Sequence, residues 1–436
     1  MRVWAGLIAG ALLIGACTAA PASPLAGTPE IVAPTPTEAM LSAPQPEALE
    51  TETPQVLSLV VWVPDRIVPA DDEHITEVLV GQIEAHNAAQ PDVNVSIRRK
   101  RSQDVGGIMS TLRTASSVAP SALPDITLLR REDLITASQN RLVQEVGDLI
   151  TPRVLGELYP AALRLGISGG DLYGISYLLD AQVMAYQDSV DDPPVWSFEE
   201  TLARNRLIAF PAARNNGVSD TFLLQYLAAS DQMDRDLADI DVIPSVLENL
   251  LEFYERMGQA GLLVPNIAEI TASTDYQLDL VSGALDAGAI STSTFLRLKR
   301  DNPNLQAGYI PSPSGEPVTV LNGWVWVIVT QNIERQQAAA EFIDWMMQPA
   351  RQAALAEAVG ILPSQRTALR QSNLEIMNVD RLNAMLNAAI VTSPASAANE
   401  VLTALQAALI SVISGERSAE AAVTRMMAQF QDGVSD

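Results

Sequence analysis

The chain has 436 residues, of which 48% are hydrophobic and 18% charged, so it can bury a large core and is neither disordered nor collagen-like. At about 100–200 residues per domain, this length predicts two domains. The net charge of −25 disfavours nucleic acid and anionic membrane surfaces as partners. Neither Lys100 nor Lys299, the two lysines, follows a glycine, which excludes a Walker-type phosphate loop.

The amino-terminal residues predict a secretion signal over 1–16. A charged start is followed by an apolar run, residues 3–14, that is too short to span a bilayer. Cys17, the only cysteine, follows Ile14-Gly15-Ala16 in a spacing that resembles a bacterial lipobox. The resemblance implies cleavage before Cys17 and a lipid on that residue. Residues 17–54 are then a lipidated, disordered stalk, because residues 18–54 contain eight prolines and neither an aromatic nor a basic residue.

Alternating strand and helix patterns begin after the stalk. Residues 55–63 form an apolar, β-branched run that predicts a strand buried on both faces of a mostly parallel sheet. Residues 73–87 predict a helix, with apolar side chains at helical spacing, and residues 93–98 predict a second strand. A further helix over 104–116 and a strand over 126–129 continue the pattern. The alternation indicates an α/β fold.

The order of short motifs along the chain resembles family 1 extracellular solute-binding proteins of ABC importers, the family of the maltose-binding protein. The matching segments cover nearly all of residues 55–430 and are found at 90–95, 123–126, 170–175, 194–202, 283–291, 308–313, 340–345, 360–364 and 414–420. Each motif is a short turn or helix pattern, and the likeness rests on their order.

This resemblance implies a two-lobed, type II periplasmic-binding-protein fold, with a mostly parallel sheet flanked by helices in each lobe and a ligand cleft at the hinge. We expect an N-lobe of residues 55–177 plus 293–342 and a C-lobe of residues 178–292 plus 343–436. The chain is expected to cross between lobes near residues 177–184, 290–293 and 341–348.

The same resemblance implies a function without catalysis or a cofactor. We expect a monomeric lipoprotein on the outer face of the cytoplasmic membrane that captures a small polar solute, a carbohydrate or polyol, and delivers it to ABC permease subunits. Only 5% of the residues are aromatic, and no aromatic residue lies between Trp345 and Phe430 to stack on a sugar ring, so long oligosaccharides are not expected.

Candidate ligand residues lie at predicted strand ends and at positions where the family contacts its ligands. Asp180 is the strongest polar candidate, because the resemblance implies an acidic ligand contact at its position, just before an apolar strand that ends in a tyrosine. Surface or core positions remain alternatives for the others. The full set is Asp65, Arg66, Arg130, Asp180, Phe222, Tyr226, Ser291, Asn322 and Trp324.

Two other functions remain open at this point. A secreted glycoside hydrolase needs only two suitably spaced carboxylates, and the chain has many. A serine hydrolase is disfavoured, because the GxSxG pattern around Ser168 has no histidine after it. A lipid-tethered envelope protein that interacts with other proteins would need neither a polar cleft nor a hinge.

Overall fold

The computed structural model describes residues 56–187, 196–214, 217–233, 235, 237–392 and 399–432. The chain divides into two units, Met1–Thr53 and Pro54–Asp436, and every described residue lies in the second. The predicted signal, Cys17 and the stalk therefore lie outside the described residues. Within the described ranges, no helix has both the length and the apolar character needed to cross a bilayer.

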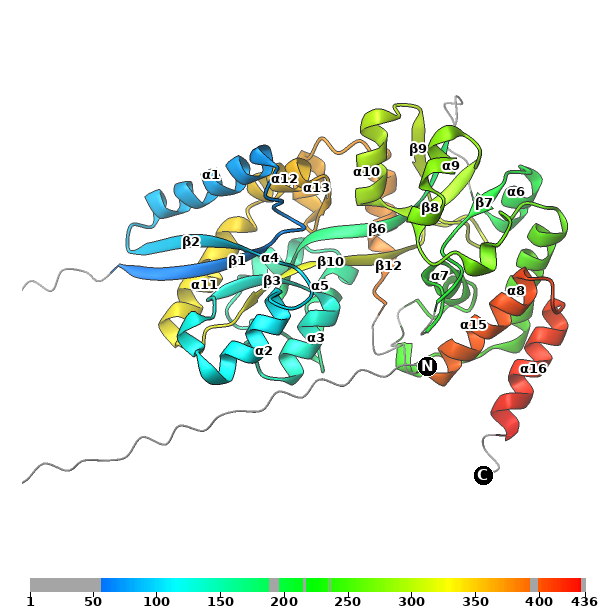
Figure 1. Ribbon diagram of the computed structural model, residues 1–436, viewed down its shortest axis with the longest axis horizontal. Coiled ribbons are helices and arrows are strands. Elements are labelled where there is room, and N and C mark those ends of the chain that lie inside the picture. Colours follow the sequence, from blue (N-terminus) through cyan, green and yellow to red (C-terminus); the bar gives the residue numbers. More distant parts are fainter. Residues whose placement is uncertain are drawn as a thin grey trace, which may run out of the picture. The chain divides into compact units, whose positions relative to one another are not determined.

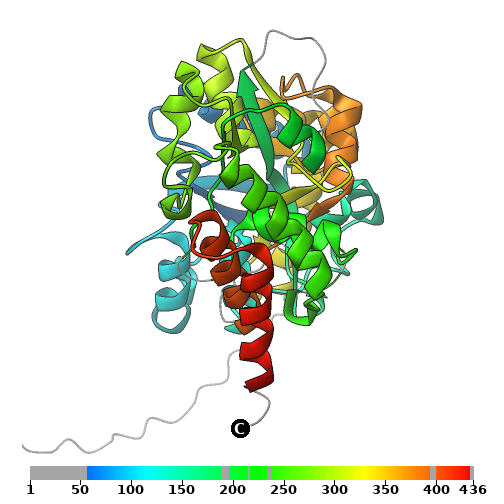
Figure 2. The same cartoon turned by 90° about the vertical axis from the view of Figure 1, so that its right-hand side faces the viewer.

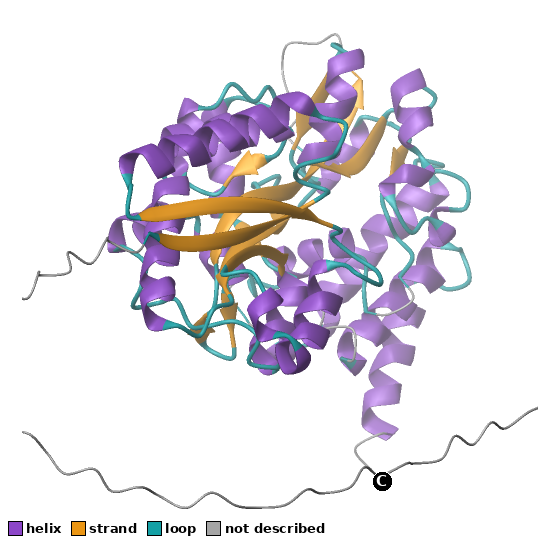
Figure 3. Cartoon of the chain, turned by 60° about the vertical axis from the view of Figure 1, so that its left-hand side comes forward, coloured by secondary structure: helices purple, strands orange, loops and turns teal. Residues whose placement is uncertain are grey.

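Helices pack around a central sheet with strand order β2-β1-β3-β10-β6-β8-β7 (Figures 1 and 3). The strands on this path are β1 (Leu57–Pro64), β2 (Val93–Lys100), β3 (Ile126–Arg130), β6 (Ile175–Gln187), β7 (Ile208–Ala209), β8 (Ala287–Ser291) and β10 (Thr319–Ile328). Short strands β9 (Leu305–Gly308), β11 (Leu362–Pro363) and β12 (Ala389–Ile390) join its sides, and β4 (Ile167–Ser168) pairs with β5 (Asp171–Leu172).

The strand directions make the sheet mixed rather than mostly parallel. β1 runs parallel to β2 and β3, as expected for βαβ units. β10 runs antiparallel to both β3 and β6, and β6 runs antiparallel to β8. The expected α/β class is therefore confirmed, and the expected strand direction is wrong for the centre of the sheet.

Two hydrophobic cores lie along this sheet. The first contains β1, β3 and most of β6 with helices α1 (Glu73–Ala89), α2 (Ile108–Val118), α3 (Arg131–Gln139), α4 (Pro152–Glu157), α5 (Pro160–Leu165), α11 (Ile333–Met346), α12 (Pro349–Val359), α13 (Arg366–Gln371) and α14 (Val379–Asn387). The second contains α7 (Asp220–Ala229), α8 (Pro244–Gln259), α15 (Glu400–Ile413) and α16 (Ala419–Asp432), which Figure 2 shows toward the viewer. Helices α6 (Phe198–Ala203), α9 (Gln277–Ser282) and α10 (Thr292–Asp301) complete the fold.

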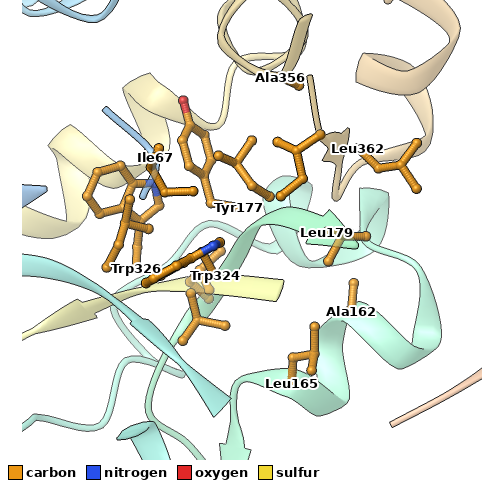
Figure 4. Packing of buried hydrophobic residues seen from close by; sticks show 14 of the residues in the cluster. Ile67, Ala162, Leu165, Tyr177, Leu179, Trp324, Trp326, Ala356 and Leu362 are labelled. Carbon is orange, nitrogen blue, oxygen red and sulfur yellow. The ribbon is translucent and has the colours of Figure 1, made fainter. Parts of the chain in front are cut away.

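Aromatic side chains fill the first core where β6 and β10 pair. Tyr177 and Trp326 lie among these side chains (Figure 4), and their ring centroids are 5.1 Å apart. Trp326 also meets Phe342 of α11 edge-on. Trp326 is 1% exposed. It is therefore a core residue.

The long strands β6 and β10 connect the two cores. β6 spans the range expected for the first crossing. The second shared strand is β10, not residues 290–293, and residues 341–348 lie within and just after α11, in the first core. Residues 343–389 thus pack with the first core instead of the expected second lobe, because α12 packs on α1 and α11 packs on β1.

Candidate ligand-binding site

A cavity of about 220 Å³ lies where the two cores meet along β6 and β10. Its walls come from the end of β3, both shared strands, the end of β8 and the start of α7. The residues that line it are Arg130, Asp180, Ala181, Gln182, Pro211, Asp220, Ser273, Ala289, Ile290, Ser291, Val320 and Asn322. Clefts between two lobes of a protein are common sites for small ligands.

Four of the nine predicted ligand residues line this cavity together. Arg130 ends β3, Asp180 lies on β6, Ser291 ends β8 and Asn322 lies on β10. Arg130 and Asn322, the two farthest apart in sequence, are separated by 192 residues. The antiparallel pairing of β6 and β10 places Asn322 opposite Asp180.

Asp180 is held firmly by the start of α10. One carboxylate oxygen accepts hydrogen bonds from the Thr292 hydroxyl and the Ser293 backbone N–H, both at 2.9 Å, and the other accepts from the Ser293 hydroxyl at 2.6 Å. A carboxylate at a helix amino terminus is favoured by the free N–H groups and the helix dipole. Asp180 therefore joins β6 to α10 beneath the cavity.

Arg130 is fixed from two sides. Its Nε lies 3.5 Å from the Glu132 carboxylate, and its guanidinium carbon lies 5.8 Å from the centroid of the Trp324 ring. Trp324 is 8% exposed and occupies the register position opposite Arg130 on β10. Trp324 thus supports Arg130 from below, although it is not among the lining residues.

Gln182, Asp220 and Ser273 also contribute polar groups to the cavity wall and were not predicted. Gln182 lies two residues after Asp180 on β6, so strand alternation points both to one face, a signal that the sequence already contained. Asp220, the first residue of α7, pairs with Arg214. Burial raises the pKa of Asp220 while Arg214 opposes that rise.

Four predicted residues lie away from the cavity, where each is hydrogen-bonded to a neighbouring residue or buried in a core. Asp65 accepts hydrogen bonds from the Ser102 backbone and hydroxyl, at 2.9 and 2.6 Å, and Arg66 donates to Gln103. The side chains of Asp65 and Arg66 therefore bond to the neighbouring loop at Ser102 and Gln103, and neither lines the cavity. Phe222 and Tyr226 are wholly buried in the second core.

The buried position of these two aromatic residues excludes stacking on a ligand. Phe222 packs at a ring-centroid distance of 5.8 Å from Tyr254. The Tyr226 hydroxyl donates to the Asp241 carbonyl and accepts from the Ile243 N–H, at 2.6 and 2.8 Å. Their one-turn spacing marks the buried face of α7, so the prediction of a stacking pair is wrong.

Residues 82–375 match the sequence profile of the family described as bacterial extracellular solute-binding protein. The chain belongs to this family. No curated protein sequence matches the chain.

Several solved structures share the fold of this solute-binding protein at low sequence identity. The cyclic α-maltosyl-1,6-maltose binding protein of Arthrobacter globiformis has a TM-score of 0.65 and 15% identity, covering 85% of this chain and 97% of its own. MalE of Listeria monocytogenes in complex with maltose has a TM-score of 0.64 and 15% identity, covering 87% and 98%. A Thermotoga lettingae solute-binding protein bound to α-D-tagatose has a TM-score of 0.56 and 15% identity, covering 85% and 97%. These likenesses confirm the two-lobed fold.

A carboxylate next to the site gives a pH-dependent prediction. Burial, with the nearby Glu132 charge, raises the pKa of Asp133 from 3.8 to about 6, against the influence of Arg130. Since the folded pKa is raised, the charged form weakens the fold: this penalty is absent below about pH 4, grows between pH 4 and 6, and is complete above pH 6.

Asp133→Asn is therefore expected to raise the free energy of unfolding at pH 7 by about 1–2 kcal/mol. The full shift corresponds to about 3 kcal/mol, part of which is offset because the first turn of α3 loses a favourable negative charge. At pH 4 the two proteins should be equally stable. Urea denaturation at both pH values measures the difference. The exposed Asp148→Asn variant is the control, and an equal gain in Asp133→Asn at pH 4 and 7 would contradict the explanation.

Proposed function

We propose that the chain captures a small, uncharged polyhydroxyl solute, a sugar of one or two rings or a polyol, and delivers it to an ABC permease. One observation carries this proposal: polar side chains from β3, β6, β8 and β10 converge on one cavity between the two cores. Membership of the solute-binding family supports it. Three relatives in fold bind maltose, a cyclic maltosyl-maltose and tagatose.

The charges around the cavity favour an uncharged solute. Arg130 is paired with Glu132, and Asp220 is paired with Arg214. Asp180 has both carboxylate oxygens occupied by Thr292 and Ser293. A charged solute would need an unpaired partner of opposite sign to offset its loss of water. Among the described residues that line the cavity, Asp180 alone lacks a partner of opposite charge, and neutral donors already occupy both of its oxygens.

The remaining polar groups suit hydroxyl groups. The Asn322 side chain makes no hydrogen bond to another described residue, so its amide can both donate to and accept from a solute. Gln182 has a similar amide, whose oxygen accepts only a long, 3.3 Å hydrogen bond from Thr221. With about 220 Å³ available and no exposed aromatic residue in the lining, a short ligand is favoured over an oligosaccharide.

Delivery requires that the protein stay near its permease and that the lobes respond to solute. We assign the first role to a lipid on Cys17 and the stalk that follows it. The second role falls to β6 and β10, because strands shared by two cores can bend and let the lobes close.

In cells that make the protein, Cys17→Ser should move it from the membrane fraction to the soluble fraction.

A thermal-shift experiment tests the proposal with matched solutes. Residues 55–436 are melted with galactose, myo-inositol and maltose, and with galacturonate and galactosamine as charged counterparts. A solute at 100 times its dissociation constant stabilises by about 2.7 kcal/mol, which raises the melting temperature by about 2–4 °C or more. We expect a shift with at least one uncharged solute and none with its charged counterparts.

Asn322→Ala links the shift to the cavity. It should abolish the response while leaving the unliganded melting temperature within about 1 °C, because the Asn322 side chain makes no hydrogen bond to another described residue. The exposed Asn94→Ala variant should respond like the wild type. A shift only with galacturonate or galactosamine, or an undiminished shift in Asn322→Ala, would overturn the assignment of this cavity. Release of a cleaved sugar from maltose would indicate a glycoside hydrolase instead.

A further inference from the structure

A second, larger cavity lies at the opposite end of β3 and β10 from the solute cavity. It measures about 410 Å³ and is bounded by α2, the entry to β3, the end of α3 and the start of α11. Its apolar walls include Leu112, Leu123 and Leu142. Two guanidinium groups, Arg141 and Arg335, also line it. The function proposed above makes no use of this cavity.

Among the described residues that line this cavity, Arg141 alone presents an unpaired charge. Arg335 is neutralised, because its Nε and Nη2 donate to the two oxygens of Asp125 at 2.7 and 2.6 Å. The Asp125 oxygens are satisfied by these bonds and by the Val60 N–H. The Arg141 side chain makes neither an ion pair nor a hydrogen bond with any other described residue. In a chain with a net charge of −25, the cavity therefore offers a positive charge beside apolar walls.

The backbone of Arg141 is held in a conformation that does not suit arginine. Its φ is +55°, in the left-handed region, and the other four described residues outside glycine with positive φ are all Asn or Asp. Arg141 lies two residues after the end of α3, in a Schellman motif. Its N–H donates to the Ser138 carbonyl, and the Leu142 N–H donates to the Ala137 carbonyl.

The chain builds the same turn elsewhere with glycine. After α8, the N–H of Gly261 donates to Gly258 and that of Leu262 donates to Met257, at the same spacing and with φ of +68°. Glycine carries no steric penalty at this position, whereas a side chain with a Cβ does. A residue other than glycine in this conformation carries backbone strain, and such strained positions cluster at functional sites.

From the unpaired guanidinium, the strained position and the apolar walls, we infer that this cavity binds a small amphipathic anion. The apolar body of the ligand would lie against the leucines, and its carboxylate or sulfonate would be bound by Arg141 in a forked, charge-assisted hydrogen bond.

Fluorescence titration with 8-anilinonaphthalene-1-sulfonate, an aromatic body with one sulfonate, tests the inference on residues 55–436. We expect saturable binding that octanoate displaces. Arg141→Asn should weaken binding at least tenfold and yet melt at the same or a higher temperature than the wild type, because asparagine tolerates the left-handed conformation. Arg141→Lys should lose less affinity than Arg141→Asn. A residue with a purely structural role would not combine lost binding with undiminished stability.

Two matched pairs of variants complete the test. Ser116→Trp fills the cavity from α2 and should prevent binding, whereas Ser117→Trp, on the exposed neighbouring position, should not. Gly261→Arg places arginine in the equivalent turn away from the cavity, and should lower the melting temperature without changing binding. Asn322→Ala in the solute cavity should leave the probe affinity unchanged, so the two sites can fail separately. Wild-type affinity in both Arg141→Asn and Ser116→Trp, or absence of binding to the wild type, would overturn the inference.

Discussion

Asp125→Ala is expected to lower the free energy of unfolding by about 2–4 kcal/mol. The Asp125 side chain is 5% exposed and receives two hydrogen bonds from Arg335 and one from the Val60 N–H. Removing one partner of a buried ion pair costs about 3–5 kcal/mol, and we lower this range because the Arg335 side chain is 32% exposed and regains water. Urea denaturation monitored by tryptophan fluorescence measures the change.

A double-mutant cycle separates the ion pair from the rest of the site. Asp125→Ala combined with Arg335→Met should lose less than the sum of the single variants, because no uncompensated guanidinium remains. The exposed Asp92→Ala variant serves as control and should change stability by less than about 0.5 kcal/mol. Additive losses across the cycle would show that Asp125 acts mainly through its bond to the Val60 N–H.

The sequence pattern of apolar and turn residues predicted several strands and helices of the first core correctly. The strand over residues 55–63 corresponds to β1, the helix over 73–87 corresponds to α1, and the strand over 126–129 corresponds to β3. The helix over 104–116 begins later, at Ile108, because the preceding residues form a tight turn in which Asp104 and Gly106 both have positive φ.

The lobe boundaries could not be found in the same way. Residues 343–389, which include the end of α11 and helices α12–α14, follow the second shared strand in sequence, and the expected division assigns them to the second lobe. The structure packs these residues in the first core, through contacts such as the edge-on approach of Trp345, near the end of α11, to His86 of α1, at 5.4 Å between ring centroids. These partners are more than 250 residues apart, and nothing in the local pattern of either helix indicates the pairing.

The candidate site likewise could be predicted only in part from the sequence. Arg130 and Asp180 were selected from their positions next to strand ends and in a family motif, and both line the cavity. Asp65 was selected on the same grounds and instead caps its own loop through Ser102. A polar residue after a strand can face a ligand or a neighbouring turn, and only the packed structure distinguishes these outcomes.

Asp180→Ala is expected to lower the affinity for the solute that responds in the thermal-shift panel by about 10- to 100-fold. Asp180 lines the cavity and fixes the start of α10, so its loss frees the Ser293 N–H and the Thr292 and Ser293 hydroxyls beneath the solute. Hydrogen bonds to a charged group contribute about 1.5–3 kcal/mol, which corresponds to this range of affinity. Isothermal titration calorimetry measures the dissociation constant.

The variants of Asp180 distinguish contact with solute from support of α10. Asp180→Asn keeps one oxygen that can accept from Ser293 and should retain more affinity than Asp180→Ala. Ser293→Ala removes the hydroxyl partner and keeps the carboxylate, so a loss of affinity there would show that the position of α10 matters. Wild-type affinity in Ser293→Ala together with a large loss in Asp180→Ala would instead assign Asp180 a direct bond to the solute. Wild-type affinity in Asp180→Ala would contradict both roles and would place the solute outside this cavity.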